Sequence, residues 1–138
     1  MKQILVLGNE TISRLVQNLL PEGSDHQVQI EEDFNRLAHG ILGVDMYKPT
    51  PDSLNQIQKV AQSSKFDMVI ISHNQGYGIA RANVLPIELR DRTVIVMGIG
   101  SEEDRKYYRV LHIDNFVTPS ALGELLVDTF SPQSSQLN

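Results

Sequence analysis

The chain of 138 residues is long enough for one domain with a substantial core and leaves little room for a second. Its 12 Lys and Arg residues against 17 Asp and Glu residues give a net charge of −5. Without a dense basic block, that balance argues against a nucleic-acid partner. The absence of cysteine excludes disulfides, thiolate catalysis and cysteine-bound metals, and it suits a reducing cytoplasm.

The apolar runs are too short to cross a membrane. Ile4–Leu7 and Met68–Ile71 are among the longest, whereas a transmembrane helix needs about 20 apolar residues. The start of the chain, Met1–Gln3, is followed by no apolar segment of signal-peptide length. We therefore expect a cytoplasmic protein that makes no membrane contact.

Short apolar segments along the chain have the pattern of β-strands. Most of them are continuous rather than alternating, as strands require when both faces of a parallel sheet are covered. A weaker candidate, Val28 and Ile30, alternates and is therefore expected at an edge. The continuous segments are Ile4–Leu7, Met68–Ile71, Val94–Met97 and Phe116–Val117.

Helical patterns lie between these strands. Apolar residues recur at i, i+3 and i+4 in Ile12–Leu20 and in Phe34–Leu42. The Thr-Pro pairs at residues 50–51 and 118–119 are typical of an N-cap followed by a first-turn proline. Residues 101–104 are close to a capping box, which predicts another helix start.

The alternation of strands and helices predicts an α/β fold. We expect a three-layer α/β/α sandwich around a five-stranded, parallel, doubly wound sheet. A single domain should span residues 1–130. Residues 131–138 are polar and of low complexity, so we expect a tail or the start of a linker.

Polar residues follow the predicted strands. In an open parallel sheet the ligand site forms beyond the carboxyl ends of the strands, which makes these residues a candidate pocket. Turns and helix caps need the same residue types, so a purely structural role is an equally good interpretation. The candidate pocket residues are Gly8, Asn9, Glu10, Thr11, Ser72, His73, Asn74, Gly98 and Thr118.

The motifs of common active sites are missing. No G-x-G-x-x-G or P-loop sequence is present. Ser72 and His73 are neighbours on an extended chain and point to opposite faces, so they cannot act as a nucleophile and its base. The four histidines lack the spacing of a metal site. We expect no catalytic residue, no metal and no cofactor.

A basic and aromatic stripe follows the fourth predicted strand. Arg105, Tyr107, Tyr108 and Arg109 lie on one predicted helix. Such a stripe is usually a solvated helix face with one tyrosine packed inward. Tyrosine and arginine are also the commonest anchors of protein interfaces, so a docking role is the alternative.

The order and sequence of these segments resemble the receiver domain of response regulators. The resemblance covers most of residues 3–130 and implies a flavodoxin-like fold. Compared with a compact receiver, residues 33–49 add about one helix between the second and third strands. The segments that carry the resemblance are Ile4–Leu7, Lys65–Ile71, Leu89–Met97, Ile113–Pro119 and Ala121–Leu126.

The acceptor and metal-binding acids of a phosphorylatable receiver are missing. By resemblance, the third strand should end at an acceptor aspartate, and two acids after the first strand should hold Mg²⁺. Ser72 occupies the acceptor position. Gly8 and Asn9 occupy the acid positions, and only Glu10 nearby carries a charge. A single acid beside an amide makes a poor Mg²⁺ site.

The residues that contact the phosphoryl group in the family are also replaced. Gly98 stands where a Thr or Ser follows the fourth strand. Pro119 stands at the position of the conserved lysine, with Thr118 just before it. Phe116 does match the aromatic position of the fifth strand.

The resemblance therefore implies a non-phosphorylatable pseudo-receiver. Such a chain would be a signalling or regulatory module that binds protein partners, without enzymatic activity, and a homodimer is also considered. The alternative is a flavodoxin-like domain that binds a small molecule or anion, such as a nucleotide or phosphate, and that could be an enzyme. By analogy with the fold, the expected docking face comprises Arg105, Tyr107, Tyr108, Arg109 and Phe116.

Overall fold

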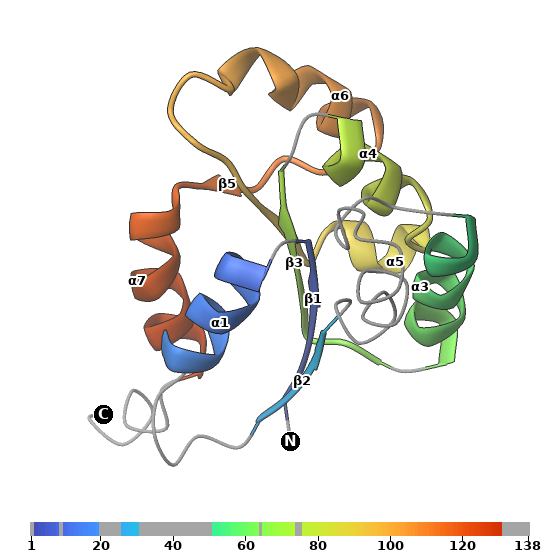
Figure 1. Cartoon of the computed structure of the whole chain (residues 1–138), viewed down its shortest axis with the longest axis horizontal. Helices are drawn as coiled ribbons and strands as arrows, with labels where there is room; N and C mark the ends of the chain where they lie inside the picture. Colours follow the sequence, from blue (N-terminus) through green and yellow to red (C-terminus); the bar gives the residue numbers. More distant parts are fainter. Residues whose placement is uncertain are drawn as a thin grey trace, which may run out of the picture.

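A computed structural model describes residues 2–8, 10–19, 26–30, 51–63, 65–73 and 76–130 (Figure 1). Strands and helices alternate through these ranges, apart from two helix pairs. The strands are β1 (Lys2–Leu7), β2 (His26–Ile30), β3 (Met68–Ser72), β4 (Thr93–Val96) and β5 (Phe116–Val117). The helices are α1 (Glu10–Leu19), α3 (Pro51–Ser63), α4 (Gly76–Asn83), α5 (Ile87–Arg90), the 3₁₀ turn η1 (Glu102–Asp104), α6 (Arg105–Val110) and α7 (Pro119–Phe130).

The strands form one sheet in the order β2-β1-β3-β4-β5, with every neighbouring pair parallel. The register pairs Ile4 with Met68 and Ser72 with Val96, so β1, β3 and β4 end at the same edge. The strand order reverses between β1 and β3, which is the switch point of a doubly wound sheet. The predicted α/β class with a parallel sheet is therefore confirmed, and β2 lies at the predicted edge.

Side chains of the central strands pack into two apolar clusters, one on each face of the sheet. Every residue of β3 and β4 is buried. Because successive side chains point to opposite faces, Val69 and Ile71 join the cluster beneath α3–α6, whereas Ile70 joins the cluster beneath α1 and α7. Figure 1 shows these two groups of helices on opposite sides of the sheet. Continuous apolar runs are what such doubly covered strands require.

The helix predicted at Ser101 starts differently from the expectation. Ser101 makes no side-chain capping bond, and the chain first forms the 3₁₀ turn η1 before α6 begins. The backbone N–H of Asp104 donates to the carbonyl of Ser101 at 3.0 Å, so the turn satisfies its own polar groups. A helical segment therefore begins at the predicted position, but without the side-chain bond of a capping box.

Two other predictions fall outside the described residues. They are the extra helix within residues 33–49 and the polar tail at residues 131–138. Among the described helices, none combines the length and the apolar character needed to cross a membrane.

Candidate functional site

The predicted pocket residues that the structure describes line none of the three cavities given below. Ser72 and His73 lie at the carboxyl end of β3, where His73 N–H donates to the Val96 carbonyl at 2.9 Å. Glu10 and Thr11 lie in the first turn of α1, and the structure describes their backbone. Asn9 and Asn74 lie outside the described residues.

The ends of β1 and β3 are in direct contact through Gly8 and Ser72. Gly8 has a φ of +134°, a conformation that favours glycine. A Cβ atom added to Gly8 would lie 2.6 Å from the Ser72 Cβ and 3.2 Å from the Ser72 nitrogen. Ser72 itself is buried. The backbone at Gly8 therefore fills the space beside Ser72 and leaves no room there for a side chain.

Thr118 caps a helix, whereas Gly98 lies exposed just after the end of β4. Thr118 Oγ1 accepts a hydrogen bond from the Ala121 N–H at 3.2 Å and lies 3.1 Å from the Ser120 hydroxyl, so it caps α7. Gly98 is exposed, and a Cβ atom there would have no neighbour within 4 Å among the described atoms. For Thr118, therefore, the geometry supports a role as a helix cap rather than as a pocket residue.

His73 is the centre of a polar cluster at this edge of the sheet. Its Nδ1 lies 2.7 Å from the Tyr108 hydroxyl, and its Nε2 lies 2.9 Å from Asp104 Oδ2. An ionised carboxylate only accepts hydrogen bonds, so Nε2 carries the proton and donates to Asp104. The bond between Nδ1 and the Tyr108 hydroxyl links Asp104, His73 and Tyr108 in series. The side chain of His73 is only 5% exposed, whereas that of Asp104 is 40% exposed.

Tyr108 is fully buried, which corrects its prediction as a docking-face residue. Its ring makes edge contacts with the rings of His73 at 5.5 Å and Phe116 at 6.0 Å between centroids. Burial, together with the negative charge of Asp104, raises the pKa of the Tyr108 phenol well above its usual value, although the nearby Arg81 opposes the shift. Tyr108 is thus a core residue that holds α6 against the sheet.

Gly78 makes room for the Tyr108 hydroxyl. A Cβ atom on Gly78 would collide with that hydroxyl and would lie 3.2 Å from the His73 Cα. Gly78 belongs to α4, so the cluster joins α4, β3, η1 and α6 in one place. Nothing local in the sequence around Gly78 predicted this requirement.

The other predicted docking residues do reach the surface. The guanidinium groups of Arg105 and Arg109 lie 5.3 and 5.6 Å from the ring centroid of the half-buried Phe116. Tyr107 is 48% exposed, and Val110, one turn later, is 77% exposed. We call these five residues the α6–β5 face. The sequence pattern missed Val110 because an apolar residue in a helical run is usually assigned to the core.

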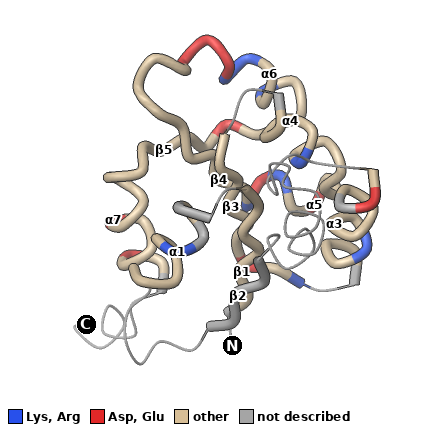
Figure 2. The backbone as a smooth tube through the Cα atoms, viewed as in Figure 1, with Lys and Arg blue, Asp and Glu red and all other residues tan. Residues whose placement is uncertain are grey.

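Charges of both signs border this face. Arg109 Nε donates to Asp114 Oδ1 at 2.8 Å, and both side chains are mostly exposed. The acids of η1 directly precede the cations of α6 (Figure 2). Arg105 Nε is buried and has no hydrogen-bond partner among the described residues.

The described part of the chain carries its surface cavities elsewhere. Three surface cavities lie away from Ser72 and His73: two near the amino ends of β3 and β4 and one between α1 and α7. Within the described residues, no group of three His, Asp or Glu side chains could hold a metal ion.

The fold has a counterpart among solved structures. No protein-family model and no curated protein matches the chain. The crystal structure of the Mn²⁺-bound form of response regulator Rcp1 is similar, with a TM-score of 0.51 and 17% identity over 94% of each chain. At this identity the likeness shows the fold: an α/β arrangement with a parallel sheet, similar to that of a receiver domain.

The contact between Gly78 and Tyr108 can be tested by a double-mutant cycle. Gly78→Ala should lower the free energy of unfolding by about 1–3 kcal/mol, because the new methyl group overpacks a filled site. Better helix propensity of alanine offsets part of that cost. In a Tyr108→Phe background the methyl group has more room, so Gly78→Ala should cost less there than in the parent chain.

Urea unfolding of the four chains measures the coupling between the two sites. Gly98→Ala is the matched control, since open space surrounds that position, and its effect should stay within about 1 kcal/mol. Simple additivity of Gly78→Ala and Tyr108→Phe would contradict the contact.

The raised pKa of Tyr108 predicts a loss of stability at alkaline pH. Above about pH 10 the unfolded chain releases the phenolic proton while the folded chain still holds it. The folded state then binds more protons, so the free energy of unfolding falls as the pH rises. In urea unfolding across this pH range, the free energy of unfolding should fall less steeply for Tyr108→Phe than for the parent chain. Tyr107→Phe, which changes an exposed neighbour, is the control, and equal slopes in all three chains would refute the assignment.

Proposed function

We propose that this chain is a non-phosphorylatable, receiver-like regulatory module that binds a protein partner and has no catalysis of its own. The contact between Gly8 and Ser72 is the observation that carries the proposal. In a phosphorylatable receiver, carboxylates would occupy both positions, one as the phosphoryl acceptor and the other as a ligand of Mg²⁺. Here the backbone of one position packs on the side chain of the other.

The chemistry of the remaining positions supports the same proposal. Ser72 offers a buried hydroxyl, which is not the carboxylate that forms an acyl phosphate. Gly98 has no side chain to contact a phosphoryl group. Thr118 uses its hydroxyl to cap α7, and the adjacent Pro119 carries no charge to balance an added phosphate.

The α6–β5 face is the proposed docking surface. Tyr107 and Val110 expose apolar area, and Arg105 and Arg109 stack near Phe116. A partner surface with an apolar centre and surrounding carboxylates would match this arrangement. The bond of Tyr108 to His73 anchors α6 to the end of β3, so the face is held by the core rather than by a free helix.

The absence of phosphorylation is directly measurable. Incubation of the chain with acetyl phosphate and Mg²⁺ should leave its intact mass unchanged, because no described carboxylate occupies the acceptor position. A phosphorylatable receiver incubated in parallel verifies the phosphodonor. Addition of one phosphoryl group to this chain would refute the proposal.

The docking surface can be tested with Val110→Asp, which replaces exposed apolar area with a charge. Full burial of such a side chain is worth about 1.5–3 kcal/mol, so binding of a partner should weaken by tenfold or more. Gln56→Asp on the exposed side of α3 is the matched control.

Affinity purification with the three chains, followed by titration of the purified partner, gives the comparison. Light scattering shows whether the partner is a second copy of the chain. Equal affinity of Val110→Asp and the parent chain would contradict this choice of surface.

A further inference from the structure

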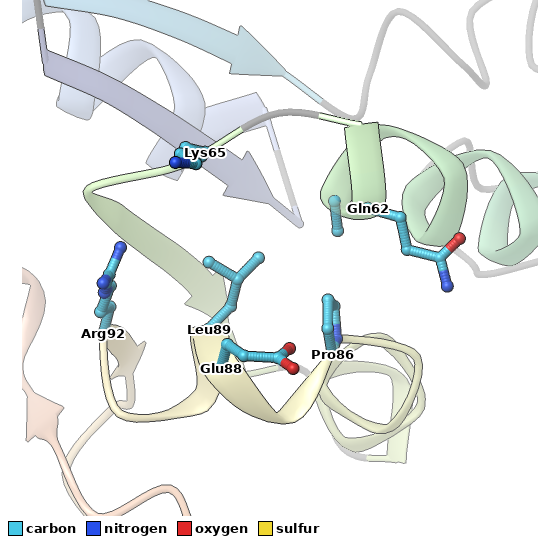
Figure 3. Close-up of a pocket in the computed structure, with 7 residues that line it drawn as sticks. Gln62, Lys65, Pro86, Glu88, Leu89 and Arg92 are labelled. Carbon is cyan, nitrogen blue, oxygen red and sulfur yellow. The ribbon is translucent and has the colours of Figure 1, made fainter.

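A cavity of about 400 Å³ lies at the opposite end of the sheet from His73 (Figure 3). Its volume falls within the range of small-molecule sites in proteins. It is formed where the end of α3, the turn before β3, α5 and the turn before β4 come together. The lining residues are Ala61, Gln62, Lys65, Pro86, Glu88, Leu89 and Arg92.

The floor of this cavity is apolar. Leu89 and Ala61 belong to the main apolar cluster and are only 6% and 4% exposed. In Figure 3 the Leu89 side chain points toward the space between the ends of α3 and α5, with Pro86 beside it. A hydrocarbon group placed here would cover the edge of the core and be removed from water.

Two cations border one side of the cavity. Lys65 precedes β3 and Arg92 precedes β4, and the parallel pairing of these strands brings the two turns together, with Val69 N–H donating to the Arg92 carbonyl at 3.1 Å. Arg92 Nη1 donates to the Phe66 carbonyl at 3.0 Å, which orients the guanidinium group. Neither cation forms an ion pair with a described residue.

The carboxylate of Glu88 limits the charge that the cavity would accept. It lies beside Pro86, apart from Lys65 and Arg92 (Figure 3). The three charged side chains sum to +1, which matches a ligand with a single negative charge. A phosphate ester with two charges would meet repulsion from Glu88, and the cavity has no glycine-rich loop to hold its oxygens.

We propose that this cavity binds a small organic carboxylate with an aliphatic body. The carboxylate faces Arg92 and Lys65, because a guanidinium group recognises the planar carboxylate through paired hydrogen bonds. The aliphatic part lies on Leu89 and Ala61. This site is separate from the α6–β5 face, so the proposal stands or falls independently of the proposed function.

The probe is hexanoate, titrated into the whole chain and followed by NMR chemical shifts. We expect saturable shifts at Leu89 and Ala61, with binding at least tenfold weaker for hexanol, which lacks the charge, and for inorganic phosphate, which lacks the hydrocarbon. Arg92→Gln and Lys65→Gln should each weaken hexanoate binding about tenfold, the loss typical of one charge-assisted hydrogen bond.

Glu88→Gln should act in the opposite direction and tighten hexanoate binding, because it removes the like charge. Lys59→Gln, on the exposed side of α3 and outside the cavity, is the control and should change nothing. Lys65, Glu88 and Lys59 are all exposed, so these variants should fold.

Any one of the following results would overturn the proposal. One is the absence of saturable shifts with hexanoate at Leu89. Another is equal binding of hexanol, which would mean that the cavity recognises hydrocarbon alone. The last is equal binding of phosphate, or unchanged hexanoate affinity in both Arg92→Gln and Lys65→Gln.

Discussion

The burial of β3 on both faces and at both edges is the constraint on which the rest of the structure depends. Each of its side chains enters one of the two apolar clusters, and its backbone pairs with β1 on one side and β4 on the other. Neither edge nor face is left for another role. Chemistry along this strand is therefore confined to the residues just before it and just after it, where Lys65 and His73 lie.

At the carboxyl end of β3, the polar groups of His73 and Tyr108 bond to each other within the core. A buried imidazole and a buried phenol each cost free energy unless their hydrogen-bonding atoms are satisfied. The hydrogen bonds between Asp104 and His73 and between His73 and Tyr108 satisfy the polar atoms of both rings. Asp104 remains partly exposed, so its carboxyl group keeps contact with water. These bonds anchor α6 and η1 to the carboxyl end of β3.

Much of the fold could be predicted because it depends on local pattern. Continuous apolar runs identified β3 and β4, and the Thr-Pro pair identified the capped start of α7 at Thr118. The partners of His73 could not be found this way, since Asp104 and Tyr108 follow it by 31 and 35 residues. Such contacts depend on how α6 crosses the end of the sheet, and no periodicity encodes that crossing.

The contact between Gly8 and Ser72 shows the same division between pattern and packing. A missing carboxylate at Gly8 can be seen in the sequence once the strands are aligned. The positive φ of Gly8 and its contact with Ser72 cannot be seen in the sequence. They mean that the space beside Ser72 is filled, so that no side chain fits at position 8. An acid restored at Gly8 would meet both an unfavourable backbone conformation and the Ser72 Cβ. At this position the backbone conformation, and not only the choice of side chain, therefore works against a carboxylate.

The two ends of the sheet consequently differ in what they offer a ligand. Open parallel sheets usually bind ligands beyond the carboxyl ends of their strands, where backbone N–H groups of the following helices face the site. Here the contact of Gly8 with Ser72 and the cluster around Tyr108 occupy part of that end. At the amino end of β3 and β4, the positive charge comes from the side chains of Lys65 and Arg92. Side chains on turns can change without disturbing β3, so this end is where the scaffold can best accommodate a new specificity.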